Sequence, residues 1–427
     1  MHLTGLIIYL NKMFEIKNCR VCNNKNLTDI LSLGNQYISN FVDSFDEKEE
    51  KIPLEIVLCQ NCKLLQLKHN APPEKMWGKQ YWYKSGISTT IKEDLKDIVQ
   101  KSEKLVKLNK GDIVVDIGCN DGTLLSFYQN KEIELVGFEP SENVAREASS
   151  KGFNVINNFF NAKNFKEKFQ GKKAKIITAI SMFYDLEDPN NFVKDIVECL
   201  EKKGIFVIQQ NYLVSMLEQN AFDNICHEHR EYYSLTSLKP LIEKYGLEIF
   251  DVELNDINGG SIRTYIKFQD NADVRPFKNF EKRFGEIERK ESAMGLNTLK
   301  PYIEFALRIN GIKKDLVGFL KDEKKNGKKI CIYGASTRGN VILQYFDLDA
   351  KLVDCIADKN SDKHGKKTVG SMIPIVSPEK MREKNPDYLL VMTWHFFEEI
   401  KKQENGLFER GVKFIVPLPA FKVISKN

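Results

Sequence analysis

The sequence contains no long hydrophobic run, and this absence excludes a typical membrane-spanning helix. No apolar stretch reaches the roughly 18 residues that a helix needs to cross a bilayer. The first residues, MHLTGLIIYLNKMF, have neither a basic segment before the short apolar stretch nor a small-residue cleavage site after it, so they do not resemble a secretory signal. We therefore expect a cytoplasmic protein with no membrane partner. Residues 1–12 are interpreted as an extension, which leaves Met1 and Met13 as equal candidates for the true start.

Basic clusters, internal repeats and low-complexity tracts are also absent. The 64 Lys and Arg residues only slightly exceed the 59 Asp and Glu residues, and the lysines are scattered along the chain. This distribution gives no support for nucleic acid as a partner, and the lack of a repeat excludes a solenoid. The chain has 9 cysteines. Without an export signal, they are expected to be thiols or metal ligands rather than disulfides.

The 427 residues are too many for one ordinary hydrophobic core, and the order of elements indicates three domains. Residues 13–75 contain strand-like runs and turn signals between two pairs of cysteines. Residues 76–275 alternate strands with helices, which predicts a mostly parallel, doubly wound sheet. Helices are expected there over 91–108 and 190–204, among others. Residues 276–427 begin with a Lys- and Glu-rich helical bridge and continue as a second alternation of strands and helices.

Two Cys-x-x-Cys pairs lie in the first domain. Each pair places two thiolates on one side of a tight turn, and two such turns complete a tetrahedron of sulfur ligands, which suits zinc. The predicted ligands are Cys19, Cys22, Cys59 and Cys62. Four sulfurs fill the coordination shell, so this zinc is expected to be structural. Four ordinary reduced cysteines, or an iron–sulfur cluster, are the alternatives, and the nearby His69 is not expected to be a ligand.

A glycine-containing turn in the second domain is typical of a nucleotide-like cofactor site. The segment GDIVVDIGCNDGTLLSFY predicts a strand, a turn and a helix, and Glu139 ends the next strand, where it can accept hydrogen bonds from a ribose diol. Asn120 stands where a nicotinamide-binding fingerprint has its second glycine, which favours S-adenosylmethionine. The predicted cofactor contacts are Asp116, Gly118, Asn120, Asp121, Gly122, Glu139 and Asn143. A purely structural turn is the alternative.

The segment FDNICHEHREYYSLTSL is the candidate catalytic region. It holds two of the six histidines of the chain. A histidine beside a carboxylate offers a proton acceptor together with a group that can orient it, so His229, Glu228 and His227 are predicted to be catalytic. A structural histidine cluster, or half of a metal site without an evident third ligand, are the alternatives.

Three further polar segments are candidates for substrate binding. An aromatic and hydroxyl cluster near residue 83 can surround a sugar, or can serve as an aromatic plug between domains. A polar turn follows a strand-like run near residue 258. Another turn, at 333–339, begins the alternating part of the last domain and places an arginine at a helix N-terminus, where an anion can bind. The predicted contacts are Tyr81, Tyr83, Ser85, Asn258, Gly259, Gly260 and Arg338. The alternative for the last turn is a purely structural role.

Taken in chain order, these motifs resemble the sugar C-methyltransferase family, whose members methylate nucleotide-linked 4-keto-6-deoxyhexoses. The resemblance runs from about residue 17 to near the end, through the paired Cys-x-x-Cys turns, YWYKSG, VDIGCNDGTLL, GFEPSENVA, SMFYDLEDP, FDNICHEHREYYSL, NDINGGS and IYGASTRGN. It implies an α/β protein with an N-terminal four-cysteine zinc subdomain, a central class I methyltransferase (Rossmann-like) domain and a C-terminal Rossmann-like domain. It also implies S-adenosylmethionine as cofactor and a nucleotide sugar as substrate, held between the first two domains with contacts from the third.

The resemblance also implies a mechanism. His229 would remove a proton next to the keto group, Glu228 would hold or polarise the imidazole, and Tyr81, Tyr83 and His227 are candidate donors to the resulting enolate.

Three departures from the family pattern keep other reactions open: Cys226 stands in place of a tyrosine, Gln209 in place of an acid, and the triplet HEH in place of DEH. Methylation on nitrogen or oxygen of a surface-polysaccharide sugar is one alternative. A nicotinamide-dependent sugar reductase or epimerase, or a binding protein with degenerate sites, are the others. The sequence does not indicate the oligomeric state.

Overall fold

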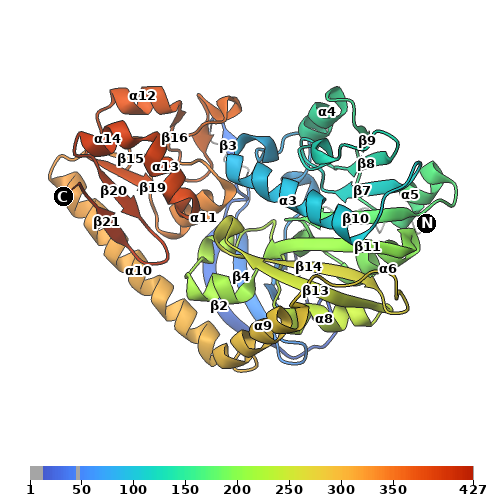
Figure 1. Ribbon diagram of the computed structural model, residues 1–427. Helices are drawn as coiled ribbons and strands as arrows, with labels where there is room; N and C mark the ends of the chain where they lie inside the picture. Colours follow the sequence, from blue (N-terminus) through green and yellow to red (C-terminus); the bar gives the residue numbers. More distant parts are fainter. Residues whose placement is uncertain (1–12, 45–48, 427) are drawn as a thin grey trace, which may run out of the picture.

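The computed structural model describes residues 13–44 and 49–426, so the expected extension at residues 1–12 lies outside the described residues. Figure 1 shows the chain as two α/β bodies, with a smaller group of strands beside them. Within the described ranges, no helix is both long enough and apolar enough to cross a membrane.

A seven-stranded sheet forms the central domain. Its strand order is β13-β14-β11-β10-β7-β8-β9. Strand β14 runs antiparallel to both of its neighbours, and the other pairs are parallel. The strands are β7 (Ile113–Ile117), β8 (Glu134–Phe138), β9 (Asn154–Ile156), β10 (Ala174–Ile180), β11 (Leu200–Asn211), β13 (Leu247–Asn255) and β14 (Ser261–Phe268). This is the strand order of a class I methyltransferase.

Helices cover both faces of this sheet, because its strands are apolar on both sides. The helix α3 (Thr89–Leu105) shares one hydrophobic cluster with the strands. A second hydrophobic cluster joins the strands to three further helices, α5 (Ala162–Phe169), α6 (Pro189–Cys199) and α8 (Leu235–Glu243). The helix α4 (Glu142–Ser150) lies between β8 and β9.

Two expected helices of the central domain differ in extent. The helix expected to end at residue 204 ends at Cys199, because Leu200 is fully buried and already pairs with Ala174 as part of the sheet. The helix expected after the glycine turn is reduced to the 3-10 turn η2 (Leu125–Phe127). Leu124 and Leu125 pack on the same core as α3, so one turn is enough to bury them.

The N-terminal domain is built on a four-stranded antiparallel sheet of order β12-β5-β4-β2. Three strands come from the first part of the chain: β2 (Leu27–Gln36), β4 (Ile52–Cys59) and β5 (Leu65–Leu67). The fourth, β12 (Glu231–Tyr232), comes from the central domain and lies within the candidate catalytic segment, two residues after His229. The strand β1 (Phe14–Glu15) pairs separately with β6 (His69–Asn70). The short helix α2 (Pro73–Met76) and the 3-10 turn η1 (Ser85–Ile87) follow before α3.

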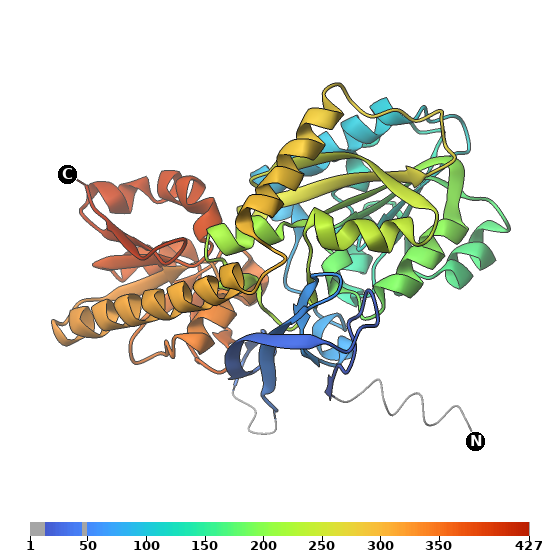
Figure 2. The ribbon, with the colours of Figure 1, turned by 90° about the horizontal axis from the view of Figure 1, so that it is seen from below.

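The C-terminal domain has a six-stranded sheet of order β18-β16-β15-β19-β20-β21. Its strands are β15 (Ile330–Tyr333), β16 (Cys355–Ala357), β18 (Ile375–Val376), β19 (Tyr388–Val391), β20 (Lys413–Val416) and β21 (Lys422–Ile424), and its helices are α11 (Thr337–Tyr345), α12 (Pro378–Glu383), α13 (Phe397–Gln403) and α14 (Asn405–Glu409). The helices α9 (Phe280–Met294) and α10 (Lys300–Lys325) connect it to the central domain, and α10 extends along its outer side (Figure 2). The predicted α/β class, with two Rossmann-like sheets, is confirmed, whereas the limits of the three domains stay a prediction.

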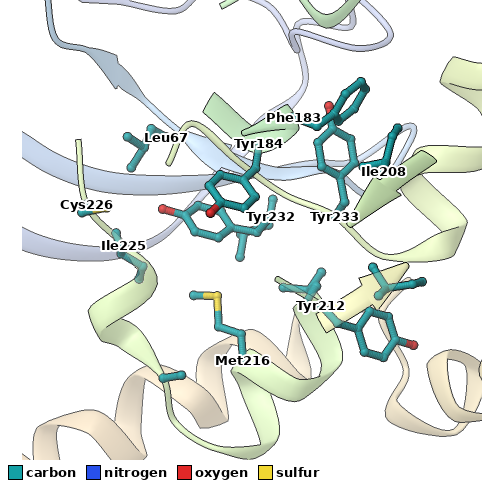
Figure 3. Packing of buried hydrophobic residues seen from close by; sticks show 14 of the residues in the cluster. Leu67, Phe183, Tyr184, Ile208, Tyr212, Met216, Ile225, Cys226, Tyr232 and Tyr233 are labelled. Atoms are coloured by element: carbon teal, nitrogen blue, oxygen red, sulfur yellow. The ribbon is translucent and has the colours of Figure 1, made fainter. Parts of the chain in front are cut away.

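The three domains share one core. A single cluster of buried residues extends from Cys19 through the central sheet to Leu418. Figure 3 shows the part where β12 meets the central domain: Tyr232 and Tyr233 lie beside Phe183 and Tyr184, and the rings of Phe183 and Tyr233 are 5.5 Å apart. A further link is β3 (Phe41–Val42), which pairs with β17 (Lys367–Thr368) of the C-terminal domain.

Candidate active site

The four predicted zinc ligands lie together in the N-terminal domain. Their Sγ atoms are all within 4.8 Å of one another, and the Cys19–Cys62 and Cys22–Cys59 pairs are each 3.5 Å apart. A tetrahedral zinc site with Zn–S bonds of about 2.3 Å separates its sulfurs by about 3.8 Å, whereas a disulfide joins them at about 2 Å. The cluster therefore fits a zinc ion with no open coordination position. His69 lies elsewhere, 3.7 Å from Glu55.

A cavity of about 810 Å³ opens where β7, β8 and β10 end. Asp116, Gly118, Asn120 and Glu139 line it. The Glu139 carboxylate accepts hydrogen bonds from the backbone N–H groups of Asn120 (3.0 Å) and Ser141 (2.8 Å). These bonds fix its orientation and leave lone pairs for a ribose diol. Both Gly118 and Asn120 have positive φ, so the turn is shaped to bring the backbone close to a ligand.

Asp116 is buried at the end of β7 and accepts a hydrogen bond from the Thr178 hydroxyl at 2.6 Å. Burial raises the pKa of Asp116 to about 7.

The other predicted cofactor residues do not line this cavity. Asp121 accepts a hydrogen bond from the backbone N–H of Gly86 (2.9 Å), and Asn143 holds both the N–H and the C=O of Tyr81 (2.8 and 2.9 Å). Gly122, with φ 78°, packs so closely on Phe153 that a Cβ atom would come within 2.7 Å of the ring. Asp121 and Asn143 thus hold the aromatic segment as one wall of the cavity. Direct cofactor binding by them stays a prediction.

A second cavity, of about 290 Å³, lies between the central and C-terminal domains. Glu228 and His229 line it. It shares four lining residues with the first cavity: Tyr81, Tyr83, Ser181 and Asn258. Because the cavities adjoin at these residues, a molecule in the first would lie next to a molecule in the second.

His229 is held as a neutral imidazole with one unprotonated ring nitrogen. Its Nδ1 lies 2.9 Å from the backbone carbonyl of Asn224, so this nitrogen donates and carries the proton. The other nitrogen, Nε2, is therefore unprotonated, and no residue in the described part of the chain hydrogen-bonds to it. Burial, together with the nearby Arg338 charge, lowers the pKa of His229 to about 3. The imidazole is thus neutral at physiological pH. Its ring also contacts that of Tyr184, with centroids 4.5 Å apart.

The expected role of Glu228 toward His229 stays a prediction, and the structure gives it no direct contact in the described residues. No hydrogen bond or ion pair joins the two side chains within residues 13–44 and 49–426, and the backbone carbonyl of Asn224 orients the imidazole instead. A sequence pattern of side chains cannot reveal such a backbone partner. Burial raises the pKa of Glu228 to about 7, and its Oε2 atom is buried without a hydrogen-bond partner.

His227 is not brought to the site. Its Nε2 lies 3.2 Å from the backbone carbonyl of Ile52 in the N-terminal sheet, and it lines neither cavity. This geometry does not support the expectation that His227 donates to an enolate, which stays a prediction. Burial lowers the pKa of His227 to about 4, so the imidazole is neutral at pH 7. Its contact with Ile52 links the central domain to the N-terminal sheet.

Arg338 lines the second cavity but already has an anionic partner. Its Nε donates to the Asp223 carboxylate at 2.8 Å and its Nη1 to the Asn258 carbonyl at 2.8 Å, while Trp394 donates to the same carboxylate at 3.1 Å. The structure thus places Arg338 in an ion pair between domains, where the sequence predicted a free anion site. Asp223 was missed because it lies far from Arg338 in the chain.

Only some of the remaining predicted substrate contacts line a cavity. Ser85 lines the first cavity only, and Asn258 lines both. Gly259 and Gly260 line neither: a Cβ atom on Gly260 would lie 2.5 Å from Ser215, so these glycines serve close packing. Three lysines that the sequence did not single out line the second cavity, namely Lys84, Lys359 and Lys363.

Parts of the chain are similar to known proteins. The plantazolicin methyltransferase BpumL, solved with SAH, is 14% identical and covers 43% of this chain and 87% of its own, with a TM-score of 0.35. The magnesium protoporphyrin IX methyltransferase ChlM from Synechocystis PCC 6803, solved with SAM, is 12% identical and covers 47% and 88%, with a TM-score of 0.33. Residues 19–77 match a zinc binding domain, residues 88–252 a methyltransferase domain and residues 256–419 a C-methyltransferase C-terminal domain.

The strand order, the glycine turn with Glu139 and the matching domains define an S-adenosylmethionine-dependent methyltransferase that carries a structural zinc ion. C-methyltransferase NovU of Streptomyces niveus is 31% identical over 415 residues, which cover 96% of this chain and 97% of the relative. The chain belongs to this C-methyltransferase family, and the predicted family is thereby confirmed.

Proposed function

We propose that the enzyme methylates a carbon atom of a nucleotide-linked keto-deoxysugar, and that His229 creates the reactive carbon by removing its proton. The observation that carries this proposal is the free Nε2 of a neutral histidine in a cavity next to the cofactor cavity. Methylation on carbon needs a base of this kind, because a C–H bond must be broken before the carbon can act as a nucleophile.

The residues of the site have distinct tasks in this proposal. Glu139 and the Gly118 turn would hold S-adenosylmethionine, which supplies an electrophilic methyl group when bound. A keto group acidifies the neighbouring carbon-bound proton, and Nε2 of His229 accepts that proton to give an enolate. Burial and the nearby carboxyl groups raise the pKa of Tyr81, so its hydroxyl stays protonated and can donate a hydrogen bond to the enolate oxygen.

The nucleotide part of the substrate is supported by the helix N-terminus at the second cavity. Ser336, which caps the N-terminus of α11, lines this cavity, and a helix N-terminus favours an anionic group such as a diphosphate. Three lysines also line it, each paired with a carboxylate: Lys84 with Asp362, Lys359 with Glu399 and Lys363 with Asp358. We expect the KM for a nucleotide-linked keto sugar to be at least tenfold lower than for the free sugar. Equal values would remove the nucleotide from the proposal.

Hydrogen exchange at the substrate carbon tests the role of His229. In deuterated water with a nucleotide 4-keto-6-deoxyhexose, the wild type should introduce deuterium next to the keto group. His229→Ala should slow this exchange about 100- to 10,000-fold, the usual contribution of a positioned base, with S-adenosylmethionine affinity within twofold of wild type. His364→Gln is the matched control, since His364 also contacts a backbone carbonyl, that of Asp358 at 2.8 Å, but lines neither cavity.

Normal exchange in His229→Ala would exclude this residue as the base. Product mass and methyl-carbon NMR test the position of the methyl group, because only methylation on carbon attaches it directly to the sugar ring. A methyl group on nitrogen or oxygen would replace the proposal with the alternative of a polysaccharide-sugar N- or O-methyltransferase.

A further inference from the structure

The chain that follows His229 is fixed on the sheet of the zinc-binding domain. Glu231 pairs with Gln66 and Tyr232 with Leu65 as strands β12 and β5. The backbone N–H of Leu67 also donates to the carbonyl of Arg230 at 2.8 Å. The position of the imidazole, two residues before Glu231, thus depends on a sheet outside the methyltransferase domain.

A side chain from the first zinc knuckle reaches the same point. Arg20 lies between the zinc ligands Cys19 and Cys22, and only 3% of its side chain is exposed. Its Nη1 donates to the Leu67 carbonyl at 2.7 Å and to Gln66 at 3.2 Å. These bonds hold the guanidinium beside β5, with its Nε 3.7 Å from the Glu231 carboxylate.

The Glu231 carboxylate depends on this charge. Its side chain is fully buried, and neither carboxylate oxygen has a hydrogen-bond partner. A buried carboxylate without hydrogen bonds is costly unless an opposite charge lies close by, and Arg20 makes the ion-pair contact here. Loss of that charge would remove the larger of the two favourable charge interactions of Glu231, those with Arg20 and Arg230, and the strand would shift to bring its carboxylate to water.

We propose that Arg20 and Glu231 form a positioning pair that fixes the His229 segment on the zinc-binding sheet. The pair does not contact the reacting atoms. It acts by holding the strand that fixes the imidazole in the second cavity. This inference rests on the proposed role of His229, and it gives the zinc-binding domain a part in catalysis: its first knuckle supports the general base.

The test compares variants that change charge with variants that keep it. Arg20→Gln keeps a hydrogen-bond donor and removes the charge. We expect deuterium exchange at the substrate carbon to slow at least tenfold, with zinc content unchanged and S-adenosylmethionine affinity within twofold of wild type. Adding Glu231→Gln removes the unpaired charge and should recover at least fivefold of that loss. Arg20→Lys should stay within threefold of wild type.

Lys68→Met is the matched control, because the Lys68 side chain lies in the same domain and pairs with Asp29 at 2.9 Å and Glu55 at 4.0 Å rather than with β12. It should exchange at the wild-type rate. A wild-type rate in Arg20→Gln, an equal loss in Arg20→Lys, or no recovery in the double variant would each overturn the proposal. If Arg20→Gln does not fold, Arg20→Lys and the double variant decide. Exchange rates within threefold of wild type in Arg20→Lys and within fivefold in the double variant support the pair. A larger loss in either variant overturns it.

Amide hydrogen exchange separates this inference from the proposed function. The peptide that covers residues 226–233 should exchange at least tenfold faster in Arg20→Gln than in wild type, whatever the substrate. If the wild type introduces no deuterium into any keto sugar, the proposed function fails while this measurement still tests the pair. Unchanged protection of the peptide would refute the positioning role.

Discussion

The ion pair between Arg338 and Asp223 should contribute strongly to the association of the central and C-terminal domains. The Asp223 side chain is fully buried and that of Arg338 is 13% exposed, so Arg338→Ala leaves a buried carboxylate without its counter-charge. Removing one partner of a buried pair typically costs about 3–5 kcal/mol. The lost hydrogen bond to the Asn258 carbonyl adds about 1 kcal/mol. Arg338→Ala should therefore lower the free energy of unfolding by about 5 kcal/mol at pH 7.5.

Urea unfolding followed by tryptophan fluorescence is the appropriate assay, because Trp394 donates a hydrogen bond to the same carboxylate. The double variant Asp223→Asn with Arg338→Ala should recover part of the loss, since no unpaired charge remains. Lys328→Ala is the control: its partner Asp387 is 37% exposed, and an exposed ion pair contributes about 1 kcal/mol or less. A loss below about 1 kcal/mol for Arg338→Ala, or no recovery in the double variant, would refute the reasoning.

Three further outcomes follow from the site. Burial raises the pKa of Glu228 to about 7 from an ordinary value of 4.5, so the folded state keeps a proton that the unfolded state loses. Stability should then fall by about 3 kcal/mol as pH rises from 4.5 to 7, and Glu228→Gln should remove this component in pH-dependent urea titrations. Cys22→Ser should lower the zinc content measured by atomic emission and increase amide exchange in β2 and β4, whereas zinc content equal to wild type would exclude Cys22 as a ligand. Gly122→Ala should lower the melting temperature, because the residue has φ 78° and its Cβ would meet Phe153 at 2.7 Å; an unchanged melting temperature would show that this turn adapts.

The sequence predicted the central fold well because its local signals agree with the tertiary structure. The apolar runs of β7 and β10 are long enough to be buried strands, and the glycine turn after β7 has positive φ at Gly118 as expected. The helix expected to end at residue 204 was too long because the amphipathic pattern continues into β11. There, pairing between Leu200 and Ala174 decides the conformation.

The site was less accessible to sequence reasoning, because its contacts join distant segments or involve backbone atoms. His229 and Glu228 were singled out as a pair by their adjacency, yet the group that orients His229 is the carbonyl of Asn224, which any residue type would provide. Asp223 and Arg338 lie 115 residues apart. Strand β12 has two residues, too few to show a periodicity of their own.

The short strand β12 also determines how the protein can be divided. In the intact chain it covers the edge of β5, so the backbone groups of β5 are paired. A fragment made of residues 13–77 would lack that cover and present an open edge to solvent, and such edges pair readily with other chains. Such a fragment should therefore associate with copies of itself. An exchange of N-terminal domains between relatives should succeed only when residues 229–232 are transferred with the domain.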